Sequence, residues 1–266
     1  MMKRKLTVVK VGGAVVEEPA QLAGLLESFA ALEGLKVLVH GGGRRATAVA
    51  AGMGLESRMV NGRRVTDEAM LEVVTMVYGG LVNKGVVAKL QANGVNATGL
   101  TGADMDVIRS HRRPPKTVTM PDGTKQEVDF GFVGDVDRVD AEALSALLEK
   151  GFTPVMAPLT HDGKGNMLNT NADTIASETA RALAALYDVT LVYTFEKKGV
   201  LSNPDDDESV IPEITHGSFR QLVADGTVSG GMMPKIENAL AAIDAGVSEV
   251  RITRADNLDG GTVIRT

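Results

Sequence analysis

The sequence predicts an α/β protein built on a mainly parallel sheet with helices on its faces. Short runs rich in Val, Leu and Ile alternate with longer segments of helical periodicity, which is the pattern of such sheets. Two of these runs end on glycines, so we expect ligands where those strands end and helices begin. The predicted strands are Leu6–Val11, Lys36–His40, Phe152–Ala157, Val189–Tyr193 and Glu249–Thr253.

Two intervals interrupt this alternation. Between Val107 and Val133 the helical periodicity is lost, and Pro114, Pro115 and the turn Pro121-Asp122-Gly123 predict hairpins and loops. A second interval of this kind runs from Thr160 to Asn171. The longer interval is interpreted as a lid, an oligomer contact or an ordinary surface hairpin.

The composition excludes several functional classes. A chain of 266 residues, 44% hydrophobic and 23% charged, can bury a core as one large domain or two intimate lobes. The absence of cysteine excludes disulfides, thiolate nucleophiles and Cys-ligated metals. A net charge of −6 without a basic block and only 3% aromatic residues argue against a nucleic-acid partner.

The hydrophobic runs predict neither a signal peptide nor a membrane anchor. Lys10 and the glycines that follow it interrupt the first run before a signal-peptide core can form. No later segment reaches the roughly 20 apolar residues of a membrane span. We therefore expect a cytoplasmic protein with no membrane partner.

The first strand ends in Val9-Lys10-Val11-Gly12-Gly13. A buried ammonium group is costly without an anionic partner, so Lys10 is expected to face a ligand at the end of the strand. Gly12 and Gly13 would let backbone N–H groups approach phosphate oxygens. A lysine that merely caps a strand before a tight turn gives the same pattern.

The second strand ends in His40-Gly41-Gly42-Gly43. Three consecutive glycines cost chain entropy, which indicates that the backbone passes very close to something, usually a ligand. Neither G-x-G-x-x-G nor G-x-x-x-x-G-K-[ST] occurs in the chain. A dinucleotide-dependent dehydrogenase or a P-loop ATPase is therefore disfavoured.

Three further segments carry candidate functional residues, each with a plainer alternative. The segment Asn61–Asp67 carries Arg63 and Arg64, one of which could offer a bidentate fork to a carboxylate, or which form a solvated pair. Asp173, in Asn169–Thr174, lies at the start of a predicted helix and either is functional or merely caps the helix or complements its dipole. Lys235 follows a glycine-containing loop, Ser229–Pro234, that delivers it onto the next helix or forms a surface turn.

Taken in order, these motifs resemble the amino-acid kinase family and, within it, the N-acetylglutamate kinases. The motifs are Lys-x-Gly-Gly, His-Gly-Gly-Gly, Asn-Gly-x-Arg-Val-Thr, Asn-x-Asn-Ala-Asp and Gly-Gly-Met-x-Pro-Lys, and they span nearly the whole chain. Asn83-Lys84 and Gly131-Phe132-Val133-Gly134 also resemble the family. The resemblance implies a three-layer αβα sandwich like that of carbamate kinase, in which residues 1–172 bind the acyl amino acid and dimerise and residues 173–266 bind the nucleotide.

The resemblance also implies roles for individual residues. Lys10 and Lys235 would be catalytic and contact the transferring phosphoryl group, and Asp173 would hold both lysines in place. The ATP phosphates would be bound by Gly12, Gly13, Lys10 and Lys235. The acylated amino acid would be bound by Gly42, Gly43, Arg64 and Asn169. No metal ligand from a protein side chain is implied; Mg²⁺ would bridge the phosphates of ATP.

The implied activity is phosphorylation of the side-chain carboxylate of N-acetyl-L-glutamate by MgATP, a step of arginine biosynthesis. Such a carboxylate, with a pKa of about 4.3, is ionised near neutral pH, so no general base is required. Lys10 and Lys235 would offset the phosphoryl charge while glycine amides donate hydrogen bonds. The early first strand, without the extra amino-terminal helix of hexameric relatives, implies a homodimer lacking strong arginine feedback.

The segment Thr194–Val200 departs from the family pattern, because it is one residue longer and has Glu196 near the usual aspartate. The resemblance therefore assigns no nucleotide-binding role there. Arg44 and Arg45 are also unusually basic for their position, and Phe195-Glu196-Lys197 resembles a branch linked to succinylated arginine intermediates. An N-succinylglutamate substrate is thus an alternative, with Arg45 pairing the extra carboxylate.

Two other readings stay open. One is a kinase acting on a carrier-linked aminoadipate or glutamate. The other is a nucleotide-binding regulatory homologue that has lost catalysis, which only the altered Thr194–Lys198 loop supports. The retention of Lys10, Asp173 and Lys235 argues against the second reading.

Overall fold

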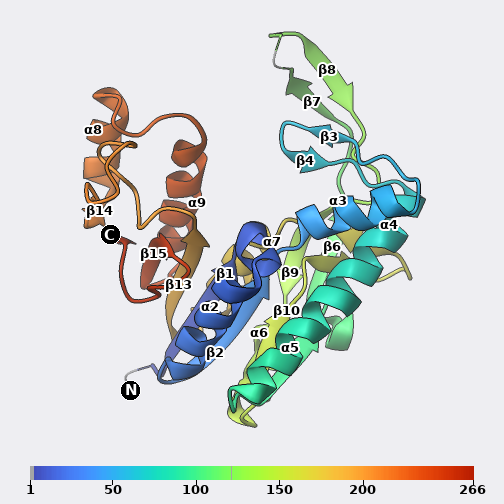
Figure 1. The fold of residues 1–266 in the computed structure, drawn as a ribbon, viewed down its shortest axis with the longest axis horizontal. Helices are drawn as coiled ribbons and strands as arrows, with labels where there is room; N and C mark the ends of the chain where they lie inside the picture. Colours follow the sequence, from blue (N-terminus) through green and yellow to red (C-terminus); the bar gives the residue numbers. More distant parts are fainter. Residues whose placement is uncertain (1–2, 121) are drawn as a thin grey trace.

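The computed structural model describes residues 3–120 and 122–266, and its centre is an eight-stranded sheet (Figure 1). The strand order is β14-β16-β15-β13-β1-β2-β10-β5, and all neighbouring pairs are parallel except β15 with β16. All five predicted strands are present in it. Their bounds are Lys5–Val11 for β1, Leu35–His40 for β2, Thr153–Met156 for β10, Asp188–Phe195 for β13 and Glu249–Arg254 for β15; the other strands are Ala97–Leu100 (β5), Glu213–Ile214 (β14) and Thr262–Ile264 (β16).

Helices cover both faces of this sheet, so the predicted three-layer sandwich is confirmed. One face packs on α2 (Pro19–Ala31), α3 (Gly43–Gly52), α4 (Glu68–Val74), η1 (Thr75–Val82) and α5 (Asn83–Ala92). The other face packs on α6 (Ala141–Glu149), α7 (Ala172–Leu183) and α9 (Met233–Asp244). The remaining helical segments are α1 (Gly13–Glu17), η2 (Asp104–Asp106), α8 (His216–Ala224) and η3 (Gly230–Met232).

The alternation of side chains along β1 decides where its lysine points. Val9 and Val11 belong to the hydrophobic cluster under α2 and α5, whereas Leu6 and Val8 belong to the cluster under α7 and α9. Successive side chains of a strand point to opposite faces. Lys10 therefore shares its face with Val8 and points toward α7 and α9.

The two intervals predicted to hold hairpins and loops form smaller sheets. A four-stranded sheet has the order β12-β11-β6-β9, and the hairpins β3–β4 and β7–β8 project from the same part of the molecule (Figure 1). Of the predicted turn between β7 and β8, Pro121 lies outside the described residues. The bounds are Met59–Val60 (β3), Arg63–Arg64 (β4), Ile108–Arg112 (β6), Lys116–Thr119 (β7), Lys125–Val128 (β8), Gly134–Val139 (β9), Leu159–His161 (β11) and Met167–Asn169 (β12).

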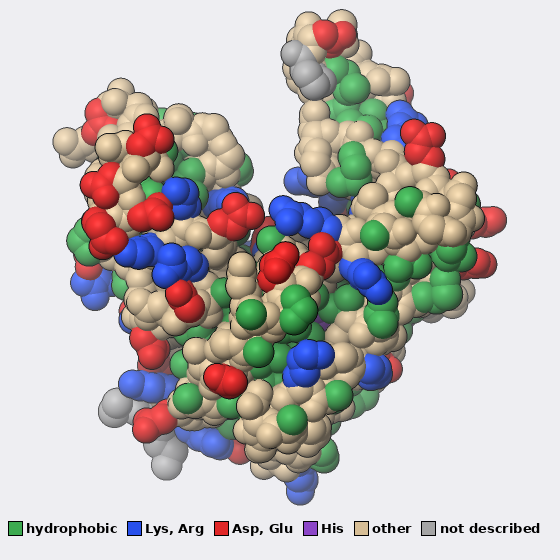
Figure 2. All heavy atoms as spheres, in the orientation of Figure 1, with side chains coloured by type: hydrophobic (Ala, Val, Ile, Leu, Met, Phe, Trp, Pro, Cys, Tyr) green, Lys and Arg blue, Asp and Glu red, His purple; other side chains and the backbone are tan. Residues whose placement is uncertain are grey.

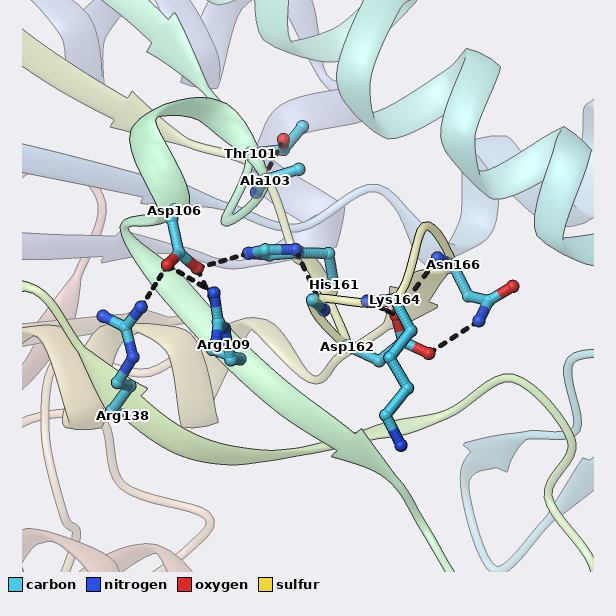
Figure 3. Close-up of polar contacts among 10 residues, drawn as sticks. Thr101, Ala103, Asp106, Arg109, Arg138, His161, Asp162, Lys164 and Asn166 are labelled. Carbon is cyan, nitrogen blue, oxygen red and sulfur yellow. Dashed lines mark hydrogen bonds and ion pairs between the residues drawn. The ribbon is translucent and has the colours of Figure 1, made fainter.

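An ionic cluster around Asp106 ties the four-stranded sheet together (Figure 3). Met105 and Asp106 have φ angles of 55° and 54°, a left-handed conformation that is uncommon for residues other than glycine. The Asp106 carboxylate accepts hydrogen bonds from Arg109, Arg138 and His161. Desolvation opposes its ionisation, but the hydrogen bonds from Arg109 and His161 hold the pKa of Asp106 below its ordinary value.

The helical segments α4, η1 and α5 run on continuously as Glu68–Ala92. By length and composition these 25 residues could cross a membrane, but charged residues interrupt them, so they are not an unbroken apolar run of about 20 residues. Val73, Val77 and Leu90 are buried against the central sheet. The apolar character of this helix thus belongs to one layer of the sandwich.

His40, the last residue of β2, is fully buried beside the glycine loop. Its Nε2 lies 3.1 Å from Asn83 Nδ2, which also donates to the Val155 carbonyl, so Nε2 accepts. Nδ1 then carries the proton and donates to the Gly41 carbonyl at 2.8 Å. Burial lowers the pKa of His40 to about 4, although the hydrogen bond to Gly41 opposes the shift.

This shift predicts an acid-sensitive fold. Because the pKa of His40 lies below the ordinary 6.5, the folded state disfavours the protonated form. Above pH 6.5 His40 is neutral in both states, and its effect on the free energy of unfolding is fully favourable. As the pH falls from 6.5 to about 4, protonation of the unfolded state lowers the free energy of unfolding by on the order of 3 kcal/mol. Urea unfolding across this pH range should show a flatter pH dependence for His40→Gln than for the wild type, whatever the variant's stability at neutral pH.

The matched control is His216→Gln, which changes an exposed histidine paired with Asp244. It should keep the wild-type pH dependence. A slope for His40→Gln equal to that of the wild type would contradict the assignment to His40.

Candidate functional site

The two glycine loops meet at the carboxyl ends of β1 and β2. These strands are parallel neighbours with Val11 beside His40, so Gly12-Gly13 and Gly41-Gly42-Gly43 emerge side by side. The molecular surface is hollowed between the α8–α9 side and the β3–β4 side, and Lys and Arg side chains gather along the floor of the hollow (Figure 2).

Close packing explains two of the three consecutive glycines without a ligand. A Cβ atom added to Gly41 would lie 3.2 Å from the Gly13 nitrogen, and one added to Gly42 would lie 3.0 Å from the Tyr78 ring. At Gly43 the nearest atoms are 4.0 Å away. The expectation that the backbone passes close to something is therefore confirmed at Gly41 and Gly42, where the close neighbours are Gly13 and Tyr78.

The larger of two adjoining cavities, about 530 Å³, lies over the end of β1 and in front of α9. Its lining includes Lys10, Gly12, Gly13, Phe195, Glu196 and Lys235. Gly13 begins α1, and the N–H groups of a helix's first turn have no acceptor within the helix. The cavity thus combines lysine ammonium groups with backbone donors, which suits an anion such as a phosphate chain.

Lys10 forms an ion pair with Asp173. The distance from Lys10 Nζ to Asp173 Oδ1 is 2.8 Å, and the Lys10 side chain is only 10% exposed. Asn171, not Asp173, caps α7, because its side chain accepts from the N–H groups of residues 173 and 174. The reading of Asp173 as the helix cap is therefore wrong, although Asp173 does lie in the first turn of α7, where a carboxylate complements the helix dipole.

Lys235 is held differently. Among the described residues no carboxylate lies within 4.0 Å of its Nζ, so the direct contact of Asp173 is with Lys10 alone. The Lys235 Nζ lies instead 3.9 Å from the centroid of the Phe195 ring. Burial lowers the pKa of Lys235 and the charge on Lys10 lowers it further, while Asp173 raises it.

The smaller cavity, about 210 Å³, brings together Gly42, Gly43, Arg64 and Asn169, the four residues predicted to bind the acyl amino acid. Gly43 lines both cavities, so they adjoin at this residue. Asn169, at the end of β12, is buried and donates from Nδ2 to Thr66 Oγ1 at 2.9 Å. Residues far apart in the chain are thereby assembled around one space.

Arg64 is a buried cation without an acidic partner. It is 8% exposed and donates to Ser57 Oγ at 2.7 Å and to the Gly43 carbonyl and Thr47 Oγ1 at 2.8 Å each. Within residues 3–120 and 122–266, no carboxylate lies within 4.0 Å of its guanidinium. A buried charge without a counter-ion is costly, so the cavity favours an anionic ligand, and the reading of Arg64 as a solvated arginine is wrong.

Several residues of the smaller cavity escaped the sequence analysis, among them Tyr78 and Arg113, and Arg63 was noted only as the neighbour of Arg64. Arg63 is adjacent to Arg64 in the sequence, and this adjacency could have indicated that it also lies at the site. Arg113 precedes the proline pair of an interval predicted only as loops, and it pairs with Asp135 at 2.6 Å. Tyr78 is hidden in the apolar run of η1, where burial raises its pKa and the nearby Arg64 opposes the rise.

Neither of the two arginines after the glycine loop lines the smaller cavity, although Arg44 lines the larger one. Arg44 and Arg45 line a depression bordered by α1, α3 and α5, and Arg45 is not part of the smaller cavity. The argument that Arg45 pairs a second substrate carboxylate therefore fails. Arg44 instead lies 3.9 Å from Glu196, with both side chains largely exposed.

Ion pairs with a nearby acidic loop hold the segment after β13 that departs from the family pattern. The strand continues to Phe195, two residues beyond its predicted end, and places Glu196 at the larger cavity. Lys197 pairs with Asp207 at 2.8 Å and Lys198 pairs with Glu208, so an acidic loop folds back on both lysines. In the part of the chain that the structure describes, no three His, Asp or Glu side chains cluster closely enough to hold a metal ion.

Comparisons with known proteins agree on one family. A sequence model of the amino acid kinase family matches residues 5–254. Proteins named acetylglutamate kinase are similar along almost their whole length. The protein of Bacteroides fragilis is 65% identical, covering 99% of this chain and 98% of its own; that of Bacteroides thetaiotaomicron is 67% identical (96% and 95%); that of Methanopyrus kandleri is 42% identical (98% and 100%).

Solved structures support the same fold. N-acetylglutamate synthase from Neisseria gonorrhoeae matches with a TM-score of 0.77 at 24% identity, over 100% of this chain and 60% of its own. Carbamate kinase from Giardia lamblia matches with a TM-score of 0.63 at 14% identity, over 99% of each chain. At these identities the likeness concerns the fold alone.

Proposed function

Because this chain belongs to the amino acid kinase family, as its five motifs predict, we propose that it phosphorylates the side-chain carboxylate of N-acetyl-L-glutamate. The co-substrate is MgATP, the products are an acyl phosphate and ADP, and the step belongs to arginine biosynthesis. The observation that carries this proposal is a cavity around the buried Arg64, which has no acidic partner among the described residues, adjoining a cavity lined by Lys10 and Lys235.

The chemistry needs charge neutralisation more than proton transfer. A carboxylate oxygen of the substrate attacks the γ-phosphorus, and the bond from that phosphorus to the bridging oxygen breaks, so ADP leaves with the electron pair. Both reactants are anionic, and Lys10 and Lys235 at the larger cavity would offset the charge on the phosphoryl oxygens. Asp173 would keep Lys10 oriented through their 2.8 Å contact.

Substrate binding would divide between the two cavities. Gly42, Gly43, Arg64 and Asn169 would hold the acylated amino acid, and Gly12 and Gly13 would donate to the ATP phosphates. Residues 1–172 would thus form the acyl-amino-acid lobe and residues 173–266 the nucleotide lobe, with Mg²⁺ entering as part of MgATP. Lys10 belongs to the first lobe and Lys235 to the second, so transfer would occur where the lobes meet.

We further propose a cytoplasmic homodimer joined through the amino-terminal lobe. The long helix Glu68–Ala92 leaves Met76 and Leu81 more than half exposed, at 51% and 53%. Large apolar side chains of this kind are common in subunit interfaces. Neither nucleic acid nor a membrane is part of the proposal.

A second candidate substrate is N-succinyl-L-glutamate. Arg45 does not support this substrate, but Arg63 and Arg113 do, because they line the smaller cavity together with Arg64. Arg113 is already paired with Asp135, whereas Arg63 is exposed and forms no ion pair among the described residues. Arg63 is therefore the side chain best placed to pair with a second carboxylate.

Trapping of the acyl phosphate with hydroxylamine tests the activity directly. N-acetylglutamate, N-succinylglutamate, free glutamate and N-acetyl-aminoadipate are compared at equal concentrations with MgATP. The highest kcat/KM identifies the substrate class. Binding of ATP without ADP formation on any of these acids would instead favour the regulatory homologue.

Variants of the candidate residues should separate transfer from binding. Lys10→Ala and Lys235→Ala should lower kcat by about 100-fold or more, since each removes a cation facing the developing phosphoryl charge. Arg64→Ala should chiefly raise KM for the acyl amino acid, by roughly 10- to 100-fold, because it removes a charged partner of the bound acid. Steady-state kinetics with both substrates varied measure both effects.

The controls are Lys125→Ala and Arg181→Ala, which change exposed cations outside both cavities. They should leave kcat and KM close to the wild type. The reverse pattern, with KM effects at the lysines and a kcat effect at Arg64, would overturn the role assignments.

Arg63→Leu discriminates between the two acyl groups. If N-succinylglutamate is the substrate, kcat/KM for it should fall by at least about 10-fold, because a charge-assisted hydrogen bond is lost. The value for N-acetylglutamate should change by less than about 3-fold, and Arg63→Lys should restore part of the loss. Equal changes for both acids would contradict a specific role of Arg63.

A further inference from the structure

Lys10, Lys197 and Lys235 line the larger cavity, and the first two each contact a carboxylate. Asp173 pairs with Lys10 at 2.8 Å, while Lys235, on α9, has no carboxylate within 4.0 Å among the described residues. Lys235 is nevertheless partly buried. An ammonium group in such a place needs another source of stabilisation before the anionic substrate arrives.

The ring of Phe195 lies next to the ammonium group of Lys235, where a carboxylate counter-ion would otherwise be expected. The Lys235 Nζ lies 3.9 Å from the centroid of this ring, and the Lys10 Nζ lies 5.5 Å from it. A cation within about 6 Å of an aromatic centroid is attracted by the negative face of the ring. The ring therefore interacts with both ammonium groups, and more strongly with Lys235.

The ring is itself fixed by the strand that carries it. Phe195 is the last residue of β13, and its ring stacks on Tyr193 with centroids 6.2 Å apart and an interplanar angle of 26°. Residues two apart share a face of a strand, so both rings lie on the side that faces α7 and α9. Tyr193 in turn donates from its hydroxyl to the Asp173 carbonyl at 3.3 Å.

We propose that Phe195 is a positioning residue for phosphoryl transfer, whose ring face serves as the counter-group of Lys235 and holds its ammonium at the nucleotide cavity. This inference rests on the proposed kinase function. It assigns a purpose to the segment that departs from the family pattern, because the aromatic ring lies at the end of the strand where that segment begins.

The charges around Lys235 fit this role. Burial and the charge on Lys10 lower the pKa of Lys235, whereas Asp173 and Glu196 raise it. A ring face favours the charged form as well, because it attracts the ammonium and not the neutral amine. Removing the ring should therefore deepen the depression of the Lys235 pKa.

The first test substitutes the ring. Phe195→Leu should lower kcat/KM for MgATP by roughly 2- to 30-fold, the range that a cation–π contact implies, and Phe195→Tyr should retain most of the activity. Phe219→Leu is the matched control, since Phe219 is also partly buried against the same hydrophobic cluster. It should leave kcat/KM near the wild type, and an equal loss in both leucine variants would overturn the proposal.

The second test keeps the shape of the side chain. Site-specific replacement of Phe195 by mono-, di- and trifluorophenylalanine weakens the negative ring face stepwise while altering the volume little. The logarithm of kcat/KM for MgATP should fall in proportion to the loss of cation affinity. Activity that does not change along the series would show that the ring only fills space.

The third test does not depend on turnover. In protein labelled with ¹³C at lysine Cε, the pH titration of Lys235 should shift to lower pH in Phe195→Leu than in the wild type. An unchanged titration would overturn the proposal even if the enzyme is active. The Lys235 titration could shift in Phe195→Leu although the wild type phosphorylates none of the four acids. That result would contradict the kinase function but not the contact between Phe195 and Lys235.

Discussion

The parallel pairing of β1 with β2 is the constraint on which the site depends. It sets Val11 beside His40, so that the two glycine loops leave the sheet side by side and pack backbone against backbone. Any Cβ atom at Gly41 would crowd the Gly13 nitrogen. The buried hydrogen bonds of His40 to Asn83 and to the Gly41 carbonyl hold the start of the second loop in place. Both cavities open above this junction and share Gly43.

Buried positive charge is the second organising feature. Arg64 and Lys235 lack acidic partners within the described residues, whereas Lys10 has Asp173 and Arg113 has Asp135. Hydroxyl and carbonyl oxygens stabilise the guanidinium of Arg64, and an aromatic ring faces the ammonium of Lys235. Neutral groups compensate a charge less than a carboxylate does, so each cavity keeps an affinity for an anion. The proposed transfer of a phosphoryl group between two anionic substrates uses this property directly.

The peripheral sheet and hairpins contribute through position rather than chemistry. β3–β4 carries Arg63 and Arg64, and β12 ends in Asn169, so these short strands bring substrate-binding candidates to the edge of the central sheet. The Asp106 cluster holds β6, β9 and β11 together outside both cavities. Differences in acyl-group preference would therefore arise in these segments while the central sheet remains the same.

The sequence by itself determined the parallel sheet and the two glycine loops, because hydrophobic alternation and glycine runs are local patterns. Its resemblance to the amino acid kinase family supplied the nine candidate site residues. It could not reveal that Gly41 and Gly42 pack closely against Gly13 and Tyr78, or that Arg113 lines the smaller cavity whereas Arg45 does not. Those facts depend on contacts between residues far apart in the chain. The tertiary structure also decided the pairing of the lysines. Asp173 on α7 forms an ion pair with Lys10 on β1, whereas the ammonium group of Lys235 on α9 lies over the ring of Phe195.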